Sequence, residues 1–273
     1  MHHDMTILEE IIAHKKNELE ERRSLYPVKL LERSVFFETK PVSLRHYLGR
    51  EDLGGIIAEF KRRSPSKGMI NEYASVEKTT IGYMQAGAAA LSVLTDTRFF
   101  GGASRDLEIA RKFNYCPILR KDFIIDEYQV IETKSIGADV VLLIAEVLTA
   151  AEINKLAALA ASLGLEVLLE LHNEDQLDKI SPDVHLLGIN NRDLHSFQVN
   201  FERSIEIAQK IPPALVKIAE SGIDSPAAIE KLRQNGFSGF LIGESFMKTA
   251  NPGKTCARFA SSIQKSNSKK AGV

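Results

Sequence analysis

The 273-residue sequence lacks features that mark several common classes of protein. It contains only two cysteines, Cys116 and Cys256, which lie far apart and form no CxxC motif. We therefore expect two reduced thiols rather than a disulfide, as is typical of a reducing compartment. No apolar run reaches the roughly 18 residues that a membrane-spanning helix needs, and the N-terminus has no apolar signal region. These absences predict a cytoplasmic protein with no membrane association.

An excess of charge of one sign is also absent. The sequence has 35 Lys and Arg residues against 36 Asp and Glu residues, so its formal net charge is -1. No global field favours nucleic acid as a partner. Metal-binding HExxH or HxH patterns, GxGxxG and Walker sequences are missing, and Ser221 has no evident partners for a hydrolase triad. His172 and His195, near predicted strand ends, are interpreted as loop residues rather than metal ligands.

From Gly54 onward the sequence contains a repeated pattern of short apolar runs followed by helical stretches. The eight runs cover residues 55–60, 89–94, 117–122, 139–144, 166–171, 185–190, 215–220 and 239–244. Strands of this kind indicate a parallel sheet covered by helices, and eight repeats are the number that closes a (β/α)8 TIM barrel. A doubly wound open sheet is the structural alternative. It usually has fewer strands and a glycine-rich turn after the first strand.

Local signals mark where the helices of this pattern begin and end. Residues 149–163 have apolar side chains at three- and four-residue spacing and follow Thr149, a candidate N-cap. Residues 225–235 begin with Ser-Pro, which is typical of a first helical turn. Glycines stand where four helices should end: Gly87, Gly137, Gly164 and Gly236.

Residues outside the repeat divide the chain into three parts. We expect residues 1–53 to form a helical extension packed on the barrel, residues 54–265 to form the barrel, and residues 266–273 to form a frayed polar tail. Apolar residues between Ile7 and Leu19 predict an amphipathic first helix, and a shorter helix is expected at 43–48. The extension either only packs on the barrel or caps the mouth of a site, and both interpretations stay open.

Charged residues gather at the C-terminal ends of the predicted strands, where barrel enzymes build their active sites. In the first strand the two-residue period places Glu59 and Lys61 on the face of Ile57, towards the lumen. Polar groups also end four other strands, namely Lys121, Glu170, Asn190 with Arg192, and Glu220 with Ser221. One such charge alone is usually a solvated loop residue. Because unpaired buried charges are costly, five strand ends of this kind should converge and can supply acid–base catalysis.

Two glycine-containing turns predict a phosphate site. Ser221 and Gly222 follow the seventh strand, and Gly243 and Glu244 follow the eighth. In barrels the loops after these two strands often hold phosphate on backbone N–H groups. Glu244 need not repel a phosphate if only its backbone N–H points inward. Either motif taken alone is explained equally well by a plain turn.

These segments resemble those of the indole-3-glycerol-phosphate synthase family. The likeness covers nearly the whole chain, and its most specific blocks are AEFKRRSPS at 58–66 and LRKDF at 119–123. The resemblance implies a (β/α)8 fold, no cofactor and no obligate protein partner. It also implies a small phosphorylated substrate, 1-(2-carboxyphenylamino)-1-deoxyribulose 5-phosphate, and the products indole-3-glycerol phosphate, carbon dioxide and water. This reaction belongs to tryptophan biosynthesis.

The resemblance also implies roles for individual positions. Lys121 looks like a general acid for ring closure and Glu170 like the general base, while Glu59 and Lys61 resemble a pair that binds substrate and moves protons. Asn190 and Glu220 resemble further polar catalytic residues. The implied substrate-binding residues are Ser64, Pro65, Phe100, Phe123, Leu142, Arg192, Leu194 and Ser221. The implied phosphate-binding residues are Gly222, Gly243 and Glu244, the last at a position where some members have serine.

Two other functions are alternatives. One is another phosphosugar barrel enzyme, such as the isomerase that acts just upstream in the same pathway. The Glu and Lys of the first strand and the N-terminal extension argue against it. The other is a non-catalytic barrel that binds phosphorylated metabolites, which should have lost some of its charged strand ends. Which lysine protonates which oxygen also stays open.

Overall fold

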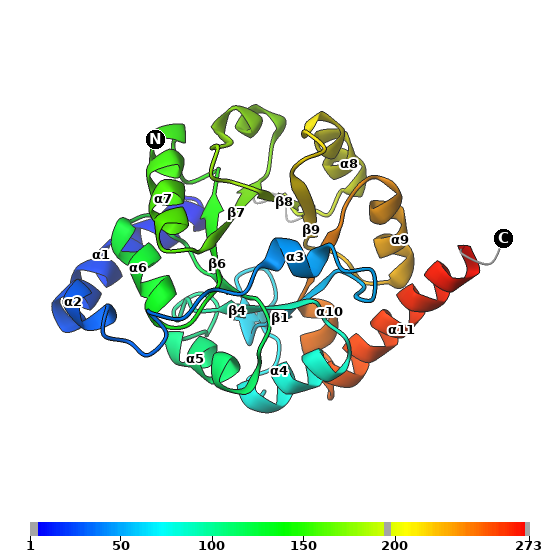
Figure 1. The fold of residues 1–273 in the computed structure, drawn as a ribbon, viewed down its shortest axis with the longest axis horizontal. Helices are drawn as coiled ribbons and strands as arrows, with labels where there is room; N and C mark the ends of the chain where they lie inside the picture. Colours follow the sequence, from blue (N-terminus) through cyan, green and yellow to red (C-terminus); the bar gives the residue numbers. More distant parts are fainter. Residues whose placement is uncertain (1–4, 194–197, 271–273) are drawn as a thin grey trace.

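The eight apolar runs form the strands of a closed parallel barrel, which confirms the predicted TIM barrel (Figure 1). The computed structural model describes residues 5–193 and 198–270, with side chains described as far as Ile263. The barrel strands are β1 (Ile56–Phe60), β4 (Ala90–Leu94), β5 (Ile118–Lys121), β6 (Val140–Ile144), β7 (Glu166–Leu171), β8 (Leu186–Asn190), β9 (Val216–Glu220) and β10 (Gly239–Ile242). Around the barrel they follow the order β1-β10-β9-β8-β7-β6-β5-β4.

Helices surround this ring of strands, as Figure 1 shows. They are α1 (Ile7–Leu25), α2 (Val28–Leu31), α3 (Leu44–Leu48), α4 (Val76–Gln85), α5 (Ser104–Phe113), α6 (Glu127–Ser135), α7 (Ala150–Ser162), the 3-10 helix η1 (Glu174–Lys179), α8 (Phe201–Lys210), α9 (Pro226–Gln234), α10 (Glu244–Met247) and α11 (Pro252–Lys270). A small hairpin of β2 (Arg63–Ser64) and β3 (Gly68–Met69), which the sequence did not predict, follows β1.

The helix signals in the sequence are confirmed. Thr149 caps α7 in a capping box with Glu152, and Ser225 caps α9, whose first residue is proline. The four glycines predicted at helix ends all have positive φ between 74° and 87°, a region that side chains with a Cβ avoid. Helix α11 runs on through Lys270, so it includes part of the segment that we expected to fray.

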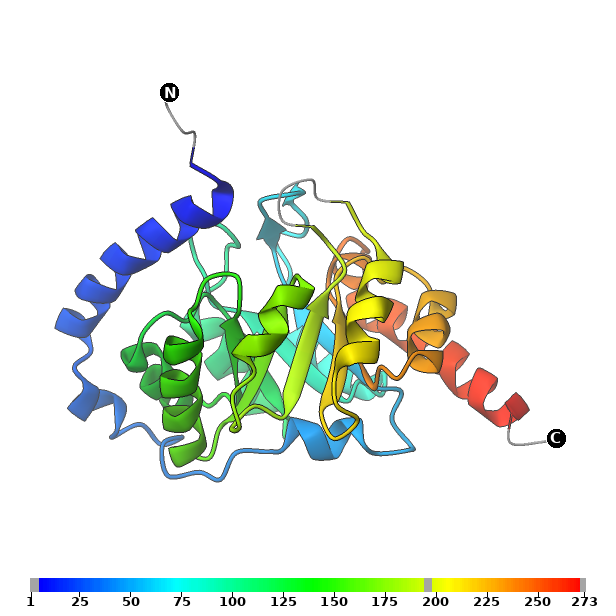
Figure 2. The same cartoon turned by 90° about the horizontal axis from the view of Figure 1, so that it is seen from above.

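Two apolar layers follow from the two-residue period of the strands. Ile57 belongs to the inner layer, whereas Phe60 belongs to the outer layer between strands and helices, as predicted. Leu44 and Leu48 of α3 join the inner layer, so α3 closes the N-terminal end of the barrel (Figure 2). The opposite end is left open for side chains at the C-terminal ends of the strands.

The parallel register brings those C-terminal ends to one level. Leu94 pairs with Lys121, Ile144 with Glu170, and Asn190 with Glu220. The polar residues that end separate strands therefore meet at the same mouth of the barrel. Both cysteines are free and buried, as expected, and no described helix is long and apolar enough to cross a membrane.

A buried carboxylate fastens the start of β5 and the segment before α3 to the barrel. Asp139 accepts hydrogen bonds from the backbone N–H groups of Val42 and Ile118, each at 2.7 Å, and pairs with Arg111 of α5. Arg111 also donates to the backbone carbonyl oxygens of Gly137 and Cys116 at 2.8 and 3.0 Å. This guanidinium compensates the buried charge of Asp139.

Replacing Arg111 with methionine should destabilise the fold, because Asp139 would stay buried without its cation. We expect the free energy of unfolding in urea to fall by about 3 kcal/mol. Arg105→Met is the control, since Arg105 makes an exposed pair with Glu108 that should contribute less than about 1 kcal/mol. Equal unfolding midpoints for the two variants would contradict this interpretation.

Candidate active site

A single cavity of about 640 Å³ opens at the C-terminal end of the barrel. Every barrel strand contributes to its lining, through Glu59, Leu94, Lys121, Leu142, Glu170, Asn190, Glu220 and Leu241. The hairpin after β1 and the loops after β8, β9 and β10 form much of the rim, and Ile7, Leu8 and Ile11 of α1 complete it. A volume of this size accommodates a drug-sized molecule.

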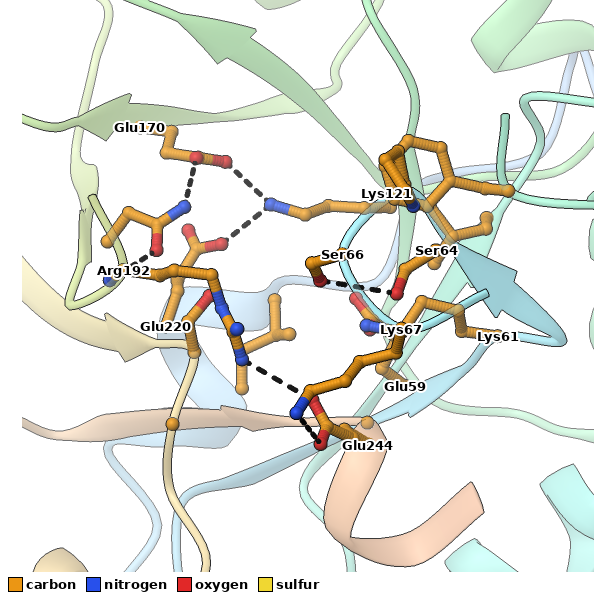
Figure 3. Close-up of a pocket in the computed structure, with 18 of the residues that line it drawn as sticks. Glu59, Lys61, Ser64, Ser66, Lys67, Lys121, Glu170, Arg192, Glu220 and Glu244 are labelled. Atoms are coloured by element: carbon orange, nitrogen blue, oxygen red, sulfur yellow. Dashed lines mark hydrogen bonds and ion pairs between the residues drawn. The ribbon is translucent and has the colours of Figure 1, made fainter. Parts of the chain in front are cut away.

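At the centre of the cavity, Lys121 lies between two carboxylates (Figure 3). Its Nζ is 2.6 Å from Oε2 of Glu170 and 2.6 Å from Oε2 of Glu220. Asn190 donates from Nδ2 to Oε1 of Glu170 at 2.8 Å. Four residues from four strands thus form one buried polar cluster, as the convergence of strand ends predicted.

The members of this cluster shift one another's pKa values in opposite directions. Burial lowers the pKa of Lys121, but Glu170, Glu220 and Glu59 outweigh burial and hold it above its usual range. Burial raises the pKa of Glu170, yet Lys121 and His172 outweigh it, so that the carboxyl stays ionised. For Glu220, burial together with the charges of Glu170 and Glu59 raises the pKa to about 7, in spite of Lys121. Near neutral pH, Glu220 is therefore the member of this trio best able to exchange a proton.

Glu220 reaches this position because β8 has a glycine beside it. A Cβ at Gly188 would lie 2.0 Å from Oε1 of Glu220. That oxygen is buried and has no hydrogen-bond partner among the described residues. Similarly, a Cβ at Gly243 would lie 2.3 Å from Oε1 of Glu59. Both glycines make room for a carboxylate of the neighbouring strand.

A second ion pair stands at the end of β1. Nζ of Lys61 lies 2.7 Å from Oε1 of Glu59, and both residues line the cavity. The pair confirms that Glu59 and Lys61 share the lumen face of the strand. Lys61 and Lys121, which come from two different strands, thus each have at least one carboxylate partner in the cavity.

The rim near β10 carries a third set of charges. The carboxylate of Glu244 lies 3.3 Å from Nη2 of Arg192 and 3.7 Å from Nζ of Lys67 (Figure 3). Beside it, Ser221 and Gly222 have φ of 68° and 72°. Positive φ is uncommon for serine, so the backbone makes a turn here, and turns can offer backbone N–H groups to an anion.

Apolar and aromatic side chains form another wall of the cavity. Phe100 and Phe123 have ring centroids 6.0 Å apart at an interplanar angle of 41°. Pro65 and Leu142 line the same cavity, as do Ile144 and Leu241. The cavity thus combines a central acid–base cluster with an apolar, partly aromatic wall and a rim that carries Arg192 and Lys67.

All but one of the site residues predicted from the sequence line this cavity. The exception is Leu194, which lies outside the described residues, as does His195. The cavity also contains residues that we did not predict. Lys67 lies in the hairpin after β1, where no periodicity exists to place it. His172 is in phase with Glu170, so the two-residue period of β7 could have indicated it.

His172 lies in the loop directly after β7, as predicted, but it also lies beside the central cluster. Its Nε2 is 3.1 Å from Oε1 of Glu170, and only 4% of the residue is exposed. Among the described residues, no group of His, Cys, Asp and Glu has the arrangement of a metal site. His172 is therefore a neighbour of the Glu170 carboxylate rather than part of a metal site in the described residues.

Comparisons with known proteins agree with this geometry. A family model described as "Indole-3-glycerol phosphate synthase" matches residues 8–259. The indole-3-glycerol phosphate synthase of Bacteroides thetaiotaomicron is 46% identical over 258 residues, which cover 94% of this chain and 99% of that protein. The protein of the same name from Salinibacter ruber is 40% identical over 271 residues, covering 98% and 100%. The chain belongs to the indole-3-glycerol phosphate synthase family.

Membership of the indole-3-glycerol phosphate synthase family gives the activity. The chain is a decarboxylating lyase of tryptophan biosynthesis, and the two alternative functions considered from the sequence are set aside. Solved structures are more distant. Thiamine phosphate pyrophosphorylase from Pyrococcus furiosus has a TM-score of 0.57 and 14% identity, covering 78% of this chain and 96% of that chain. At this identity the likeness shows the barrel fold alone.

Substituting alanine for Gly188 should impair synthase activity while leaving the barrel folded. The new methyl group would push Glu220 away from Lys121, and a misplaced catalytic group can lower kcat/KM by about a hundredfold. Formation of indole-3-glycerol phosphate would be measured beside Gly49→Ala, an exposed glycine at the opposite end of the barrel. Unchanged kcat/KM in Gly188→Ala would show that the position of the Glu220 carboxylate does not matter.

Proposed function

We propose that this cavity binds 1-(2-carboxyphenylamino)-1-deoxyribulose 5-phosphate and closes its indole ring, with Lys121 as the general acid. The arrangement that carries this proposal is a lysine held between Glu170 and Glu220 at 2.6 Å from each. Ring closure turns the ketone oxygen of the sugar into an alkoxide, which needs a proton as the charge develops. A cation already oriented by two fixed carboxylates can donate one without reorganising water.

Glu170, Glu220 and Lys61 divide the remaining proton transfers in this proposal. After Lys121 has given up its proton, the neutral carboxyl of Glu220 is close enough to protonate it again. The substrate's carboxylate leaves as carbon dioxide, and the electron pair of the broken carbon–carbon bond restores the aromatic ring. Loss of the hydroxyl as water needs an acid at oxygen and a base at the anilino N–H, and we assign the ammonium group of Lys61 as the acid and Glu170 as the base. Asn190 keeps Glu170 oriented by donating to it.

The lowered pKa of Glu170 constrains this assignment. A carboxylate that is held ionised by Lys121 is a weak base while that lysine keeps its proton. Once Lys121 has donated, the attraction that lowers the pKa of Glu170 is removed and the carboxylate becomes more basic. Glu170 is therefore a stronger base in the interval before Glu220 protonates Lys121 again.

The two ends of the substrate would bind on opposite sides of the cluster. For the phosphate, we propose the backbone N–H groups around Gly222 and Gly243, with Ser221, Arg192 and Glu244 beside them. Glu59 and Lys61 would contact the sugar between the two ends. The proposed binding residues for the anthranilate ring and its surroundings are Ser64, Pro65, Phe100, Phe123, Leu142 and Leu194.

We also propose the wider setting of this activity. The proton transfers and the loss of carbon dioxide balance with side chains alone, so the reaction is assigned no cofactor. Two free, buried cysteines fit a reducing cytoplasm, and near-zero net charge fits a protein without nucleic-acid or membrane partners. No obligate protein partner is proposed. Residues 1–53 are assigned to a helical extension, residues 54–265 to the catalytic barrel, and residues 266–273 to a tail.

Lys121→Ala tests the central role of the lysine. Turnover should fall by about 10²- to 10⁴-fold, because no other group donates from that position. The product's indole fluorescence provides the measurement, since the chain has no tryptophan to add background. Lys29→Ala, on the exposed side of α2, is the matched control and should keep full turnover. Normal turnover of a folded Lys121→Ala variant would remove Lys121 from the mechanism.

Glu220 should give the enzyme a pH limit near neutrality. Re-protonation of Lys121 requires the neutral form of Glu220, so kcat/KM should fall as the pH rises through about 7. In Glu220→Gln this fall should disappear, together with most of the turnover. If kcat/KM of Glu220→Gln still fell as the pH rises through about 7, the ionisation would belong to another group.

The same pKa shift has a consequence for stability. The pKa of Glu220 lies above its ordinary 4.5 in the folded protein, so the folded state binds this proton more tightly than the unfolded chain. The resulting stabilisation is complete below pH 4.5 and is lost as the pH rises through about 7. Glutamine at this position does not titrate. The free energy of unfolding of Glu220→Gln, measured in urea, should therefore increase relative to that of the native chain as the pH rises from 4.5 to about 7.

A further inference from the structure

Helix α1 brings a buried charge to the rim of the cavity. Ile7, Leu8 and Ile11 of this helix line the cavity, and Lys15 follows Ile11 by one helical turn on the same face. The side chain of Lys15 is only 2% exposed. Neither the proposed catalysis nor substrate binding uses this lysine.

Three carboxylates surround the Lys15 ammonium group. Nζ lies 3.0 Å from Oδ2 of Asp96, 3.0 Å from Oδ1 of Asp122 and 2.8 Å from Oε2 of Glu18. Burial lowers the pKa of Lys15, but these carboxylates outweigh it and keep the lysine charged. Asp96 and Asp122 belong to the barrel rather than to the helix, since they stand just beyond the ends of β4 and β5.

The same two aspartates hold the backbone of the aromatic wall. Oδ1 of Asp96 accepts hydrogen bonds from the backbone N–H groups of Phe99 and Phe100 at 2.8 and 3.2 Å. Oδ1 of Asp122 accepts one from the N–H of Phe123 at 2.8 Å. A single lysine therefore joins the two carboxylates that position Phe100 and Phe123.

The position of Lys15 is itself fixed by a second contact of α1. Arg22, two turns further along the helix, donates from Nε to Oε1 of Glu132 at 2.7 Å. The other carboxylate oxygen of Glu132 accepts from Arg120 at 2.6 Å, and Arg120 also pairs with Asp122 at 3.2 Å. Helix α1 is thus attached at two points to one buried ionic network around β5.

We propose that Lys15 is a positioning residue that sets the separation of Phe100 and Phe123, and thereby the slot for the aromatic ring of the substrate. The inference rests on the proposed function, because that function assigns these two side chains to the anthranilate ring. It also gives the N-terminal helix a definite part in the site, which sequence patterns left open. Lys15 would act on substrate binding through the two aspartates, without touching the substrate.

Removal of the cation should disturb one half of the cavity only. Without Lys15, Asp96 and Asp122 would be neighbouring buried anions that must separate, bind a proton or admit water. Any of these changes moves the N–H groups of Phe100 and Phe123. The phosphate loops follow β9 and β10, neither of which neighbours β4 or β5 in the barrel, so they should keep their arrangement.

The test compares Lys15→Met with Lys15→Arg and with Lys16→Met, a matched change at the exposed neighbouring lysine of the same helix. For Lys15→Met, we expect the KM of the aminodeoxyribulose phosphate to rise about tenfold, as for a modest misplacement of a binding group, while kcat changes much less. The inhibition constant of inorganic phosphate should stay the same. Lys15→Arg should restore most of the KM, and Lys16→Met should match the native chain.

The outcomes separate this inference from the proposed function. Lack of product with the native chain and with Lys16→Met would reject the proposed function itself. With both active, an unchanged KM in Lys15→Met would overturn the role of Lys15. A parallel rise in the inhibition constant of inorganic phosphate would also overturn it, since that indicates general damage. If Lys15→Met does not fold, Lys15→Gln decides by the same criteria, and failure of both to fold would reduce Lys15 to a folding role.

Discussion

The charge of Lys121, buried between Glu170 and Glu220, is the constraint on which the rest of the site depends. An ammonium group in this position is tolerable only because two carboxylates meet it at 2.6 Å, and each carboxylate comes from a different strand. The barrel must therefore close in the correct register for the charges to compensate one another. Gly188 illustrates the requirement, because even a methyl group on β8 would occupy the place of a Glu220 oxygen.

Sequence patterns predicted much of this arrangement because it depends on interactions between residues that are near one another along the chain. The two-residue period of a strand decides which side chains face the lumen, so Glu59 and Lys61 were placed correctly from β1 alone. Parallel strands end at one edge, so the meeting of Lys121, Glu170, Asn190 and Glu220 followed from eight strands of similar length. Helix caps such as Thr149 and Ser225 depend only on neighbouring residues, so the sequence also predicts them.

Other parts of the site depend on contacts between distant segments, and no local pattern reports them. Gly188 looks like an ordinary strand glycine until Glu220 of the next strand is placed beside it. Lys15 shares the helical spacing of Ile11 and Leu19, which indicates its face, but its partners Asp96 and Asp122 lie about eighty and a hundred residues away along the chain. Lys67 lies in a hairpin without apolar periodicity. His172 differs, since its two-residue spacing from Glu170 is a local pattern that indicates the same side of the chain.

The balance of charge in the cavity explains why binding and catalysis can use separate residues. Lys61 and Lys121 are matched by Glu59 and Glu170, and below about pH 7 the carboxyl of Glu220 is neutral. The central cluster therefore carries little net charge to attract a substrate that bears a carboxylate and a phosphate. Attraction must come from the rim, where Arg192 and Lys67 share the single carboxylate of Glu244. These cations stand apart from Lys121. The rim can therefore bind an anionic group of the substrate while the ammonium group of Lys121 stays available for proton transfer.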